Sequence, residues 1–275
     1  MYLVFSSNSR THYAMKVFPY KDQEMNKAYK REIRFERLSH PNILKFISSQ
    51  PICDIQIEKQ VVRVSYILME LASFGTFSDL LGPTQLFHDE KLVRTYFHQL
   101  IDGLEYLHSK DIAHLDLRLS NLLLGDDFKL KIVNFESAYR KSDESIFTKG
   151  CKDYRPPEIK NRSCTIPEAA DIYSAGIVLF VLKTGTFPYS EDLARDENYK
   201  LYEYLANESE NFWAAHEAFN DKDPQADASF KELFMGMTRT DPNKRLTIKE
   251  IKQSKWFKGP TYDEKELRLK MSKRL

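Results

Sequence analysis

The sequence His-Leu-Asp-Leu-Arg-Leu-Ser-Asn, residues 114–121, determines how the rest of this chain is interpreted. It holds one carboxylate, Asp116, and one amide, Asn121, five positions apart. An amphipathic segment at residues 90–110 precedes it, and a short apolar run at residues 122–124 follows it. This order predicts a loop of polar groups that leaves a packed helix and enters a strand.

The composition is that of an ordinary globular protein: 275 residues, 42% hydrophobic and 29% charged, with a net charge of +1. Because the charges nearly balance, neither nucleic acid nor an anionic membrane is expected as a partner. The longest apolar run, residues 175–182, is shorter than the roughly 20 residues of a membrane-spanning helix. The three cysteines form no C-x-x-C pair, which indicates reduced thiols in a cytoplasmic protein and no zinc site.

Hydrophobic periodicity divides the chain into a strand-rich first part and a helical second part. Strands are predicted for five segments: residues 2–5, 12–18, 54–60, 61–70 and 130–133. Helices are predicted for residues 22–38, 90–110 and 169–184, and several more follow from residue 199 to about residue 257. We therefore predict an α+β fold with a small antiparallel-sheet lobe at residues 1–70 and a larger helical lobe at residues 71–258. A charged tail helix is predicted at residues 259–275.

The spaced motifs around the opening stretch resemble those of eukaryotic protein kinases, in that family's order. They comprise Tyr-Ala-Met-Lys at 13–16, His-Pro-Asn-Ile at 40–43, Asn-Phe-Glu at 134–136, Tyr-Arg-Pro-Pro-Glu at 154–158, Asp-Ile-Tyr-Ser-Ala-Gly at 171–176 and Arg245. The resemblance covers residues 1–258 and implies a bilobal fold that binds ATP and Mg²⁺ and phosphorylates protein Ser or Thr. The closing Ser-Lys-Trp-Phe, residues 254–257, is most similar to the calcium/calmodulin-dependent group.

The resemblance implies that Lys16 pairs with the α- and β-phosphates of ATP and that a glutamate of the following helix holds this lysine. We assign that glutamate to Glu32, although the family's spacing, counted back from His40, falls on Arg31. The alternatives are a solvated lysine and one surface carboxylate among many. The pairing of Lys16 with Glu32 is thus a specific expectation of the sequence.

Residues 68–72, Leu-Met-Glu-Leu-Ala, resemble the segment that joins the two kinase lobes. The resemblance makes Met69 the residue at the back of the adenine pocket and assigns adenine hydrogen bonds to the backbone of Glu70 and Ala72. Leu123 belongs to the same set of nucleotide-binding residues. The alternative is packing at the end of a strand.

Within the loop itself, the resemblance assigns to Asp116 the orientation of the substrate hydroxyl and the acceptance of its proton. Asn121 would ligate a metal ion through its amide oxygen. Arg118 replaces the lysine common in Ser/Thr kinases and would neutralise the γ-phosphate. Leu115 removes the arginine that usually pairs with an activation-loop phosphate, so control by that phosphate is not expected. Three hydroxyl residues remain candidate phosphorylation sites: Ser142, Ser145 and Thr148.

Two departures from the family pattern concern the metal ion and the phosphate cover. Asn134 replaces the aspartate that grips Mg²⁺, and a neutral amide is a poorer ligand for this hard cation. Glu136 adds a carboxylate nearby, which we do not expect to compensate. Counting back from Lys16, Met1 falls near the final valine of the family's glycine-rich pattern, so this chain is expected to lack the first strand and that loop.

Two structural contacts are also implied by the resemblance. Glu158 should pair with Arg245, and Asp171 should brace the backbone of the catalytic loop. In the tail, three apolar residues lie four positions apart among basic ones: Leu267, Met271 and Leu275. They indicate either a helix that binds a partner, with calmodulin or the domain itself as candidates, or a solvated terminal helix.

Two functions remain open from the sequence. The first is ATP-dependent phosphoryl transfer to protein Ser or Thr, weak or impaired in this chain. The second is a pseudokinase, meaning a kinase fold that serves as a nucleotide- or protein-binding regulatory or scaffold module. Asp116 and Lys16 favour the first, whereas Asn134 and Leu115 favour the second.

Overall fold

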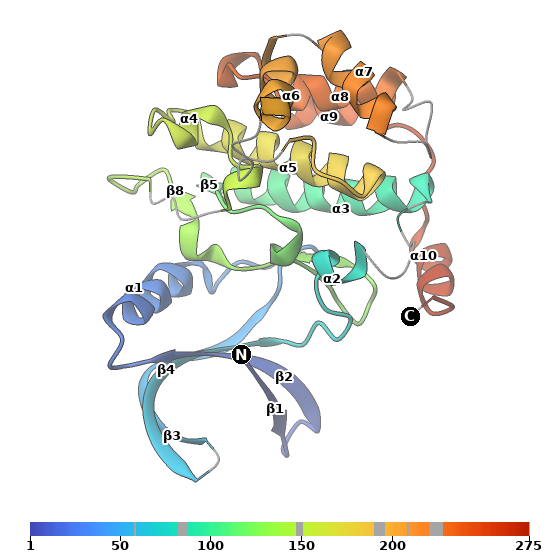
Figure 1. The fold of residues 1–275 in the computed structure, drawn as a ribbon. Coiled ribbons are helices and arrows are strands. Elements are labelled where there is room, and N and C mark those ends of the chain that lie inside the picture. Colours follow the sequence, from blue (N-terminus) through green and yellow to red (C-terminus); the bar gives the residue numbers. More distant parts are fainter. Residues whose placement is uncertain are drawn as a thin grey trace.

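The computed structural model describes residues 1–57, 59–81, 87, 89–146, 151–189, 196–207, 209–219 and 228–274. The candidate phosphorylation site Thr148 and the tail residue Leu275 lie outside the described residues. A small lobe built on a curved antiparallel sheet lies at one end, and a larger helical lobe lies at the other (Figure 1). The prediction of a bilobal α+β fold is confirmed.

The small lobe contains a four-stranded antiparallel sheet in the order β1-β2-β4-β3. Its strands are β1 (Tyr2–Ser6), β2 (Thr11–Pro19), β3 (Phe46–Ile57) and β4 (Gln60–Glu70). Side chains alternate between the two faces of a strand, so Lys16 and Phe18 of β2 share one face. Phe18 packs there against Tyr29 of the helix that follows β2.

The predicted start of β3 at residue 54 is wrong, because the strand begins at Phe46. Its first half is largely exposed, and its pairing with β4 shifts register twice, between Phe46 and Ser48 and between Gln50 and Cys53. Each shift breaks the two-residue alternation of side chains. The periodicity that identifies strands in the sequence is therefore absent from this half of β3.

Helix α1 (Gln23–Glu32) packs against the sheet and carries Glu32 in its last turn. Its first turn is capped by the Asp22 carboxylate, which accepts hydrogen bonds from the N–H groups of Glu24 and Met25 at 2.9 and 3.1 Å. The helix ends six residues earlier than predicted. The chain continues as a 3₁₀ turn, η1 (Ile33–Phe35), whose i→i+3 hydrogen bonds tighten the backbone.

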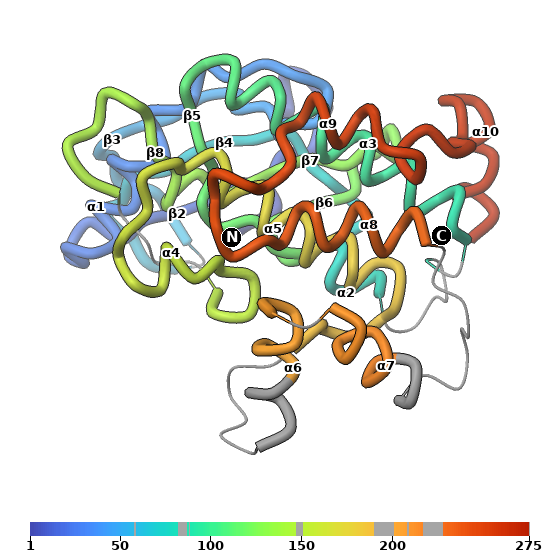
Figure 2. Tube along the Cα trace, turned by 90° about the horizontal axis from the view of Figure 1, so that it is seen from above, coloured from blue at the N-terminus to red at the C-terminus, as the bar shows by residue number. Residues whose placement is uncertain are grey.

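The large lobe is organised around α3 (Glu90–His108) and α5 (Pro167–Thr184), which pack against each other. Around them lie α2 (Phe77–Leu81), α4 (Pro157–Lys160), α6 (Asp196–Asn207), α7 (Ser209–Phe219), α8 (Ala228–Met237), α9 (Ile248–Gln253) and α10 (Glu264–Met271). Figure 2 shows α6 and α7 on one side of this lobe and α10 at another edge. Residues 169–182 of α5 are all buried, as its continuous apolar sequence predicts.

Two short antiparallel strand pairs flank the predicted catalytic loop. Strand β5 (Ile112–Ala113) pairs with β8 (Tyr139–Arg140), and β6 (Leu122–Leu124) pairs with β7 (Leu130–Ile132). Residues 114–121 connect β5 to β6, and Asn134 follows β7 by two residues. The catalytic loop and the Asn-Phe-Glu segment therefore lie side by side.

The tail helix α10 packs on the large lobe, so the interpretation of it as a solvated helix is wrong. Leu267 and Met271 are 3% and 0% exposed and belong to the same hydrophobic core as α3. Ion pairs join Glu266 to Lys91 at 3.0 Å and Lys270 to Asp89 at 2.5 Å. These contacts agree with the alternative in which the tail binds its own domain. They cover Leu267 and Met271, two of the three apolar residues considered for calmodulin binding.

Candidate active site

The strand lysine and the helix glutamate form a partly buried ion pair. Lys16 Nζ lies 2.5 Å from Glu32 Oε2, and Glu32 is 1% exposed. Arg31, the residue on which the family spacing falls, contacts the Glu136 carboxylate instead, at 3.0 Å. The structure therefore selects Glu32. Burial makes this pairing necessary, because an unpaired charge in the interior is strongly destabilising.

Three of the four predicted adenine-binding residues meet in the core of the small lobe. Met69, Ala72 and Leu123 pack into one cluster with Ile67 of β4. The Glu70 carboxylate accepts a hydrogen bond from the Lys45 N–H at 3.0 Å. Within the described part of the chain, the Ala72 N–H has no hydrogen-bond partner. A donor is thus present where the resemblance places an adenine contact.

The catalytic loop is braced by Asp171, as predicted. This fully buried carboxylate accepts hydrogen bonds from the N–H groups of His114 and Leu115, both at 2.8 Å, and contacts His108 Nε2 at 3.0 Å. Leu115 adopts a left-handed backbone conformation with φ of 59°. That conformation costs about 1–2 kcal/mol for a residue with a side chain. The two bonds to Asp171 help to hold the loop in it.

Asp116 lies almost buried at the centre of the site, with 8% of its surface exposed. Its Oδ2 accepts a hydrogen bond from Asn121 Nδ2 at 2.8 Å, and its Oδ1 accepts one from the Cys151 N–H at 3.2 Å. Arg118 Nε lies 3.6 Å from the same Oδ1. The predicted base, metal ligand and phosphate-neutralising residue are therefore brought together. Their assigned roles stay predictions.

Asn134 connects both halves of the site through its amide. Its Nδ2 donates to Asn121 Oδ1 at 3.3 Å and to Asp116 Oδ2 at 3.5 Å, and its Oδ1 accepts from Lys16 Nζ at 3.3 Å. The backbone is left-handed here, with φ of 68°, a conformation that asparagine and aspartate tolerate better than other residues. The sequence placed Asn134 near the metal position, but gave no indication of these three contacts.

The donor set does not fit Mg²⁺ well. This hard cation prefers carboxylate oxygens in near-octahedral geometry. The two amide oxygens assigned to it, on Asn121 and Asn134, each face an N–H donor of a neighbouring side chain. Glu136 is directed to Arg31, in agreement with the expectation that it does not compensate. Among the described residues, no group of three His, Cys, Asp or Glu side chains could hold a metal ion.

Phe135, which the sequence analysis did not single out, anchors the Asn-Phe-Glu segment in the core. It is 1% exposed, and its ring lies 5.6 Å from that of Phe35 after α1 and 5.2 Å from that of His114. Its position between two polar residues was the signal available in the sequence. Because the ring packs on both lobes, it fixes where the neighbouring Asn134 lies.

Asp143 anchors the start of the segment after β8. Asp143 forms an ion pair with Arg34 and accepts a hydrogen bond from the Arg140 N–H at 2.9 Å. Burial raises the pKa of Asp143, but these contacts outweigh it and hold that pKa below its usual value. Leu115 packs nearby in an apolar cluster that includes Ile146. The ion pair of Asp143 and the apolar packing of Leu115 thus hold this part of the chain, in which Leu115 replaces the arginine usual in the family.

Replacing Asp143 by asparagine is expected to lower the free energy of unfolding by about 1 kcal/mol, since a partly exposed ion pair is lost. A carboxyl whose pKa is lowered by folding stabilises above its unfolded pKa, about 3.9, and loses this effect as the pH falls through the folded value. The difference between the variant and the original protein should therefore shrink below about pH 4. Urea unfolding at several pH values measures it, with exposed Glu144→Gln as the control. A difference that does not change with pH would contradict this account of Asp143.

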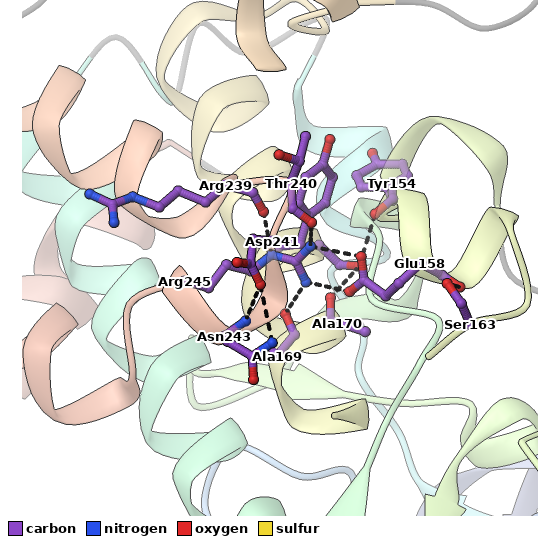
Figure 3. A network of polar contacts seen from close by, with 12 residues as sticks. Tyr154, Glu158, Ser163, Ala169, Ala170, Arg239, Thr240, Asp241, Asn243 and Arg245 are labelled. Carbon is purple, nitrogen blue, oxygen red and sulfur yellow. Dashed lines mark hydrogen bonds and ion pairs between the residues drawn. The ribbon is translucent and has the colours of Figure 1, made fainter. Parts of the chain in front are cut away.

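The predicted pair of Glu158 and Arg245 is present deep in the large lobe (Figure 3). Arg245 Nη2 donates to Glu158 Oε2 at 2.7 Å, and the other nitrogens of the guanidinium reach the carbonyls of Ala169 and Arg239 at 3.0 and 2.7 Å. Every part of this planar fork therefore has a partner. The contact ties the first turn of α4 to the turn before α9.

A sheet lobe on a helical lobe, with a lysine–glutamate pair and a braced Asp/Asn loop between them, defines a protein kinase fold. A family model described as a protein kinase domain matches residues 1–257. The chain belongs to the protein kinase family. The candidate-site residues above are the positions at which it keeps or departs from that family's pattern.

The similar proteins are serine/threonine kinases. The serine/threonine-protein kinase stk11 of Xenopus laevis is 32% identical over 237 residues, which cover 83% of this chain and 50% of that protein. CBL-interacting protein kinase 26 of Oryza sativa subsp. japonica is 31% identical over 236 residues, covering 83% and 43%. The serine/threonine-protein kinase CHK1 of Mycosarcoma maydis is 27% identical over 309 residues, covering 92% and 44%.

The chain thus spans about half the length of these relatives, or less. Its similarity to the calcium/calmodulin-dependent group stays a prediction. In the part of the chain that the structure describes, no helix is long and apolar enough to cross a membrane.

Proposed function

We propose that this chain binds ATP between its lobes and transfers the γ-phosphoryl group to protein Ser or Thr at a low rate. The observation that carries the proposal is the contact of Asn134 with Lys16, Asn121 and Asp116. Three of the residues to which the resemblance assigns positioning roles, Lys16, Asn121 and Asp116, lie around this amide. Asn134 itself replaces the aspartate with which the family binds the metal ion.

The roles follow from where the side chains lie. The backbone of Glu70 and Ala72 would hold the adenine, and Leu123 would pack against it. Lys16, fixed by Glu32, would reach the phosphates. Asp116 would orient the hydroxyl of the substrate and take its proton, because the bonds from Asn121 and the Cys151 N–H fix its carboxylate. Positioning of this kind supplies most of the catalysis in phosphoryl transfer.

A second function, that of a regulatory binding module, is favoured by one contact. Asn134 Nδ2 donates to Asp116 Oδ2, the oxygen that Asn121 also contacts, so this half of the proposed base is already engaged by two donors. A site closed in this way would position ATP without completing the reaction. In either case the expected partners are ATP and a protein, and a cytoplasmic location is part of the proposal.

The two functions are separated by comparing the original protein with the Asp116→Asn variant in a phosphorylation assay on a Ser/Thr-containing protein substrate. We expect slow transfer that falls by about 100-fold or more in the variant, since the positioned base is lost. A matched change outside the site, exposed Asp263→Asn, controls for handling of the protein. Equal rates for the original protein and Asp116→Asn would support the binding module and contradict the enzyme.

A further inference from the structure

We propose that the site around Asn134 binds a nucleoside triphosphate without a divalent cation, and that Asn134 is the residue that makes this binding independent of metal. The inference rests on the proposed function, because it takes ATP as the ligand of this site. It concerns how the site binds the negatively charged phosphates. It does not depend on how fast the site transfers a phosphoryl group.

The first step is that the polar groups of the site satisfy one another through N–H donors alone. Asn134 Nδ2 lies between Asn121 Oδ1, at 3.3 Å, and Asp116 Oδ2, at 3.5 Å. Asn121 Nδ2 in turn donates to Asp116 Oδ2 at 2.8 Å. An amide group of the protein itself therefore already contacts Asn121 Oδ1, the oxygen that the resemblance assigns to the metal ion, and Asp116 Oδ2, an oxygen of the proposed base.

The second step is that only one orientation of the Asn134 amide is compatible with its surroundings. Its oxygen accepts a hydrogen bond from the Lys16 ammonium at 3.3 Å, and an ammonium has donors and no acceptor. Turning the amide over would place its NH₂ group against Lys16 and its oxygen against the oxygens of Asp116 and Asn121. The NH₂ group is thus held toward the metal position by three neighbours.

The third step is electrostatic. The charges of Lys16 and Arg118 are balanced by those of Glu32 and Asp116, so a neutral Asn134 leaves the site without excess negative charge. An aspartate at this position would add a negative charge beside a polyanionic ligand. Repulsion of this kind in a partly buried site is strong, and a cation is then needed to offset it. With asparagine at this position, the site lacks the carboxylate that would bind a cation and also lacks the negative charge that would make a cation necessary.

No other described carboxylate restores the missing charge at this point. Glu136 is two residues away, but its Oε1 lies 3.0 Å from Arg31 Nη2 and each side chain is only 21% exposed. Glu32 is committed to Lys16. The protein therefore keeps the polar contacts of a phosphate site while it lacks the carboxylate that would make the site depend on Mg²⁺.

The test is ATP binding by the full chain, measured by isothermal titration calorimetry in EDTA and again in excess Mg²⁺. We expect dissociation constants within about threefold of each other. Binding in Mg²⁺ that is weakened more than about tenfold by EDTA would overturn the inference and leave the proposed nucleotide site intact. An absence of ATP binding in both buffers would overturn the proposed site and the inference together.

The Asn134→Asp variant tests the assigned residue. Aspartate tolerates the same left-handed backbone, so the fold should persist, as thermal unfolding will show. We expect metal-free ATP binding to weaken by about tenfold or more and Mg²⁺ to restore it. The matched control is Asn161→Asp, the same chemical change at an exposed position, which should leave both constants unchanged. Metal-free binding by Asn134→Asp that equals the original would overturn the role of Asn134.

Discussion

Replacing Arg245 by alanine is expected to lower the free energy of unfolding by about 3–5 kcal/mol. The variant leaves the Glu158 carboxylate buried without its partner, and the carbonyls of Ala169 and Arg239 lose a donor (Figure 3). An uncompensated buried charge is costly because water no longer solvates it. Urea unfolding followed by circular dichroism measures the change.

The neighbouring Lys244 offers a matched control, since its side chain is 72% exposed and its contact with Asp241 is long, at 3.9 Å. Lys244→Ala should change the free energy of unfolding by less than about 0.5 kcal/mol. Similar values for Arg245→Ala and Lys244→Ala would contradict the structural role of the buried pair. Such a result would show that the guanidinium of Arg245 is not sequestered from water in solution.

Replacing Met271 by alanine should also destabilise the protein strongly, by about 2–5 kcal/mol. Its side chain is fully buried between α10 and the large lobe, so truncation removes apolar contacts and leaves a cavity. Leu269 on the same helix is 58% exposed and provides the control, for which a change below about 0.5 kcal/mol is expected. If both variants unfold like the original protein, the tail does not pack on its own domain.

The architecture could be predicted because its signals are long or highly specific. Residues 90–110 repeat apolar positions at helical spacing and form α3, and the continuous apolar run in α5 becomes its buried helix. The ordered motifs placed the braced loop, and the contacts of Asp171 follow the expectation. The local sequence pattern was enough to predict a helix or strand wherever burial of one face makes apolar residues recur at a regular spacing.

The remaining features depend on contacts between distant segments. The choice of Glu32 over Arg31 was left uncertain by spacing and is decided by which side chain faces Lys16. The first half of β3 lacks alternation because its register shifts. The pairing of Asp143 with Arg34 joins residues more than a hundred positions apart, and no local pattern reports it.

The same limit applies to Asn134. The resemblance to the family's motif identified an amide in the place of a carboxylate and predicted weaker binding of Mg²⁺. It did not predict that this amide would link Lys16, Asn121 and Asp116, because those contacts join three separate elements. The structure thus shows that the residue in place of the metal ligand is part of a hydrogen-bond network. It also shows that this network contains a neutral amide where the family has a negative charge.

Phosphoryl transfer by Asn134→Asp is the most direct measurement of whether one amide limits an otherwise assembled site. In the presence of Mg²⁺ or Mn²⁺, we predict a rate on the order of 100-fold above that of the original protein, the size of effect seen when one electrostatic contact to a transition state is removed. Asn161→Asp should show no gain, and adding Asp116→Asn to Asn134→Asp should abolish it. An unchanged rate in Asn134→Asp would contradict the view that Asn134 limits phosphoryl transfer at this site.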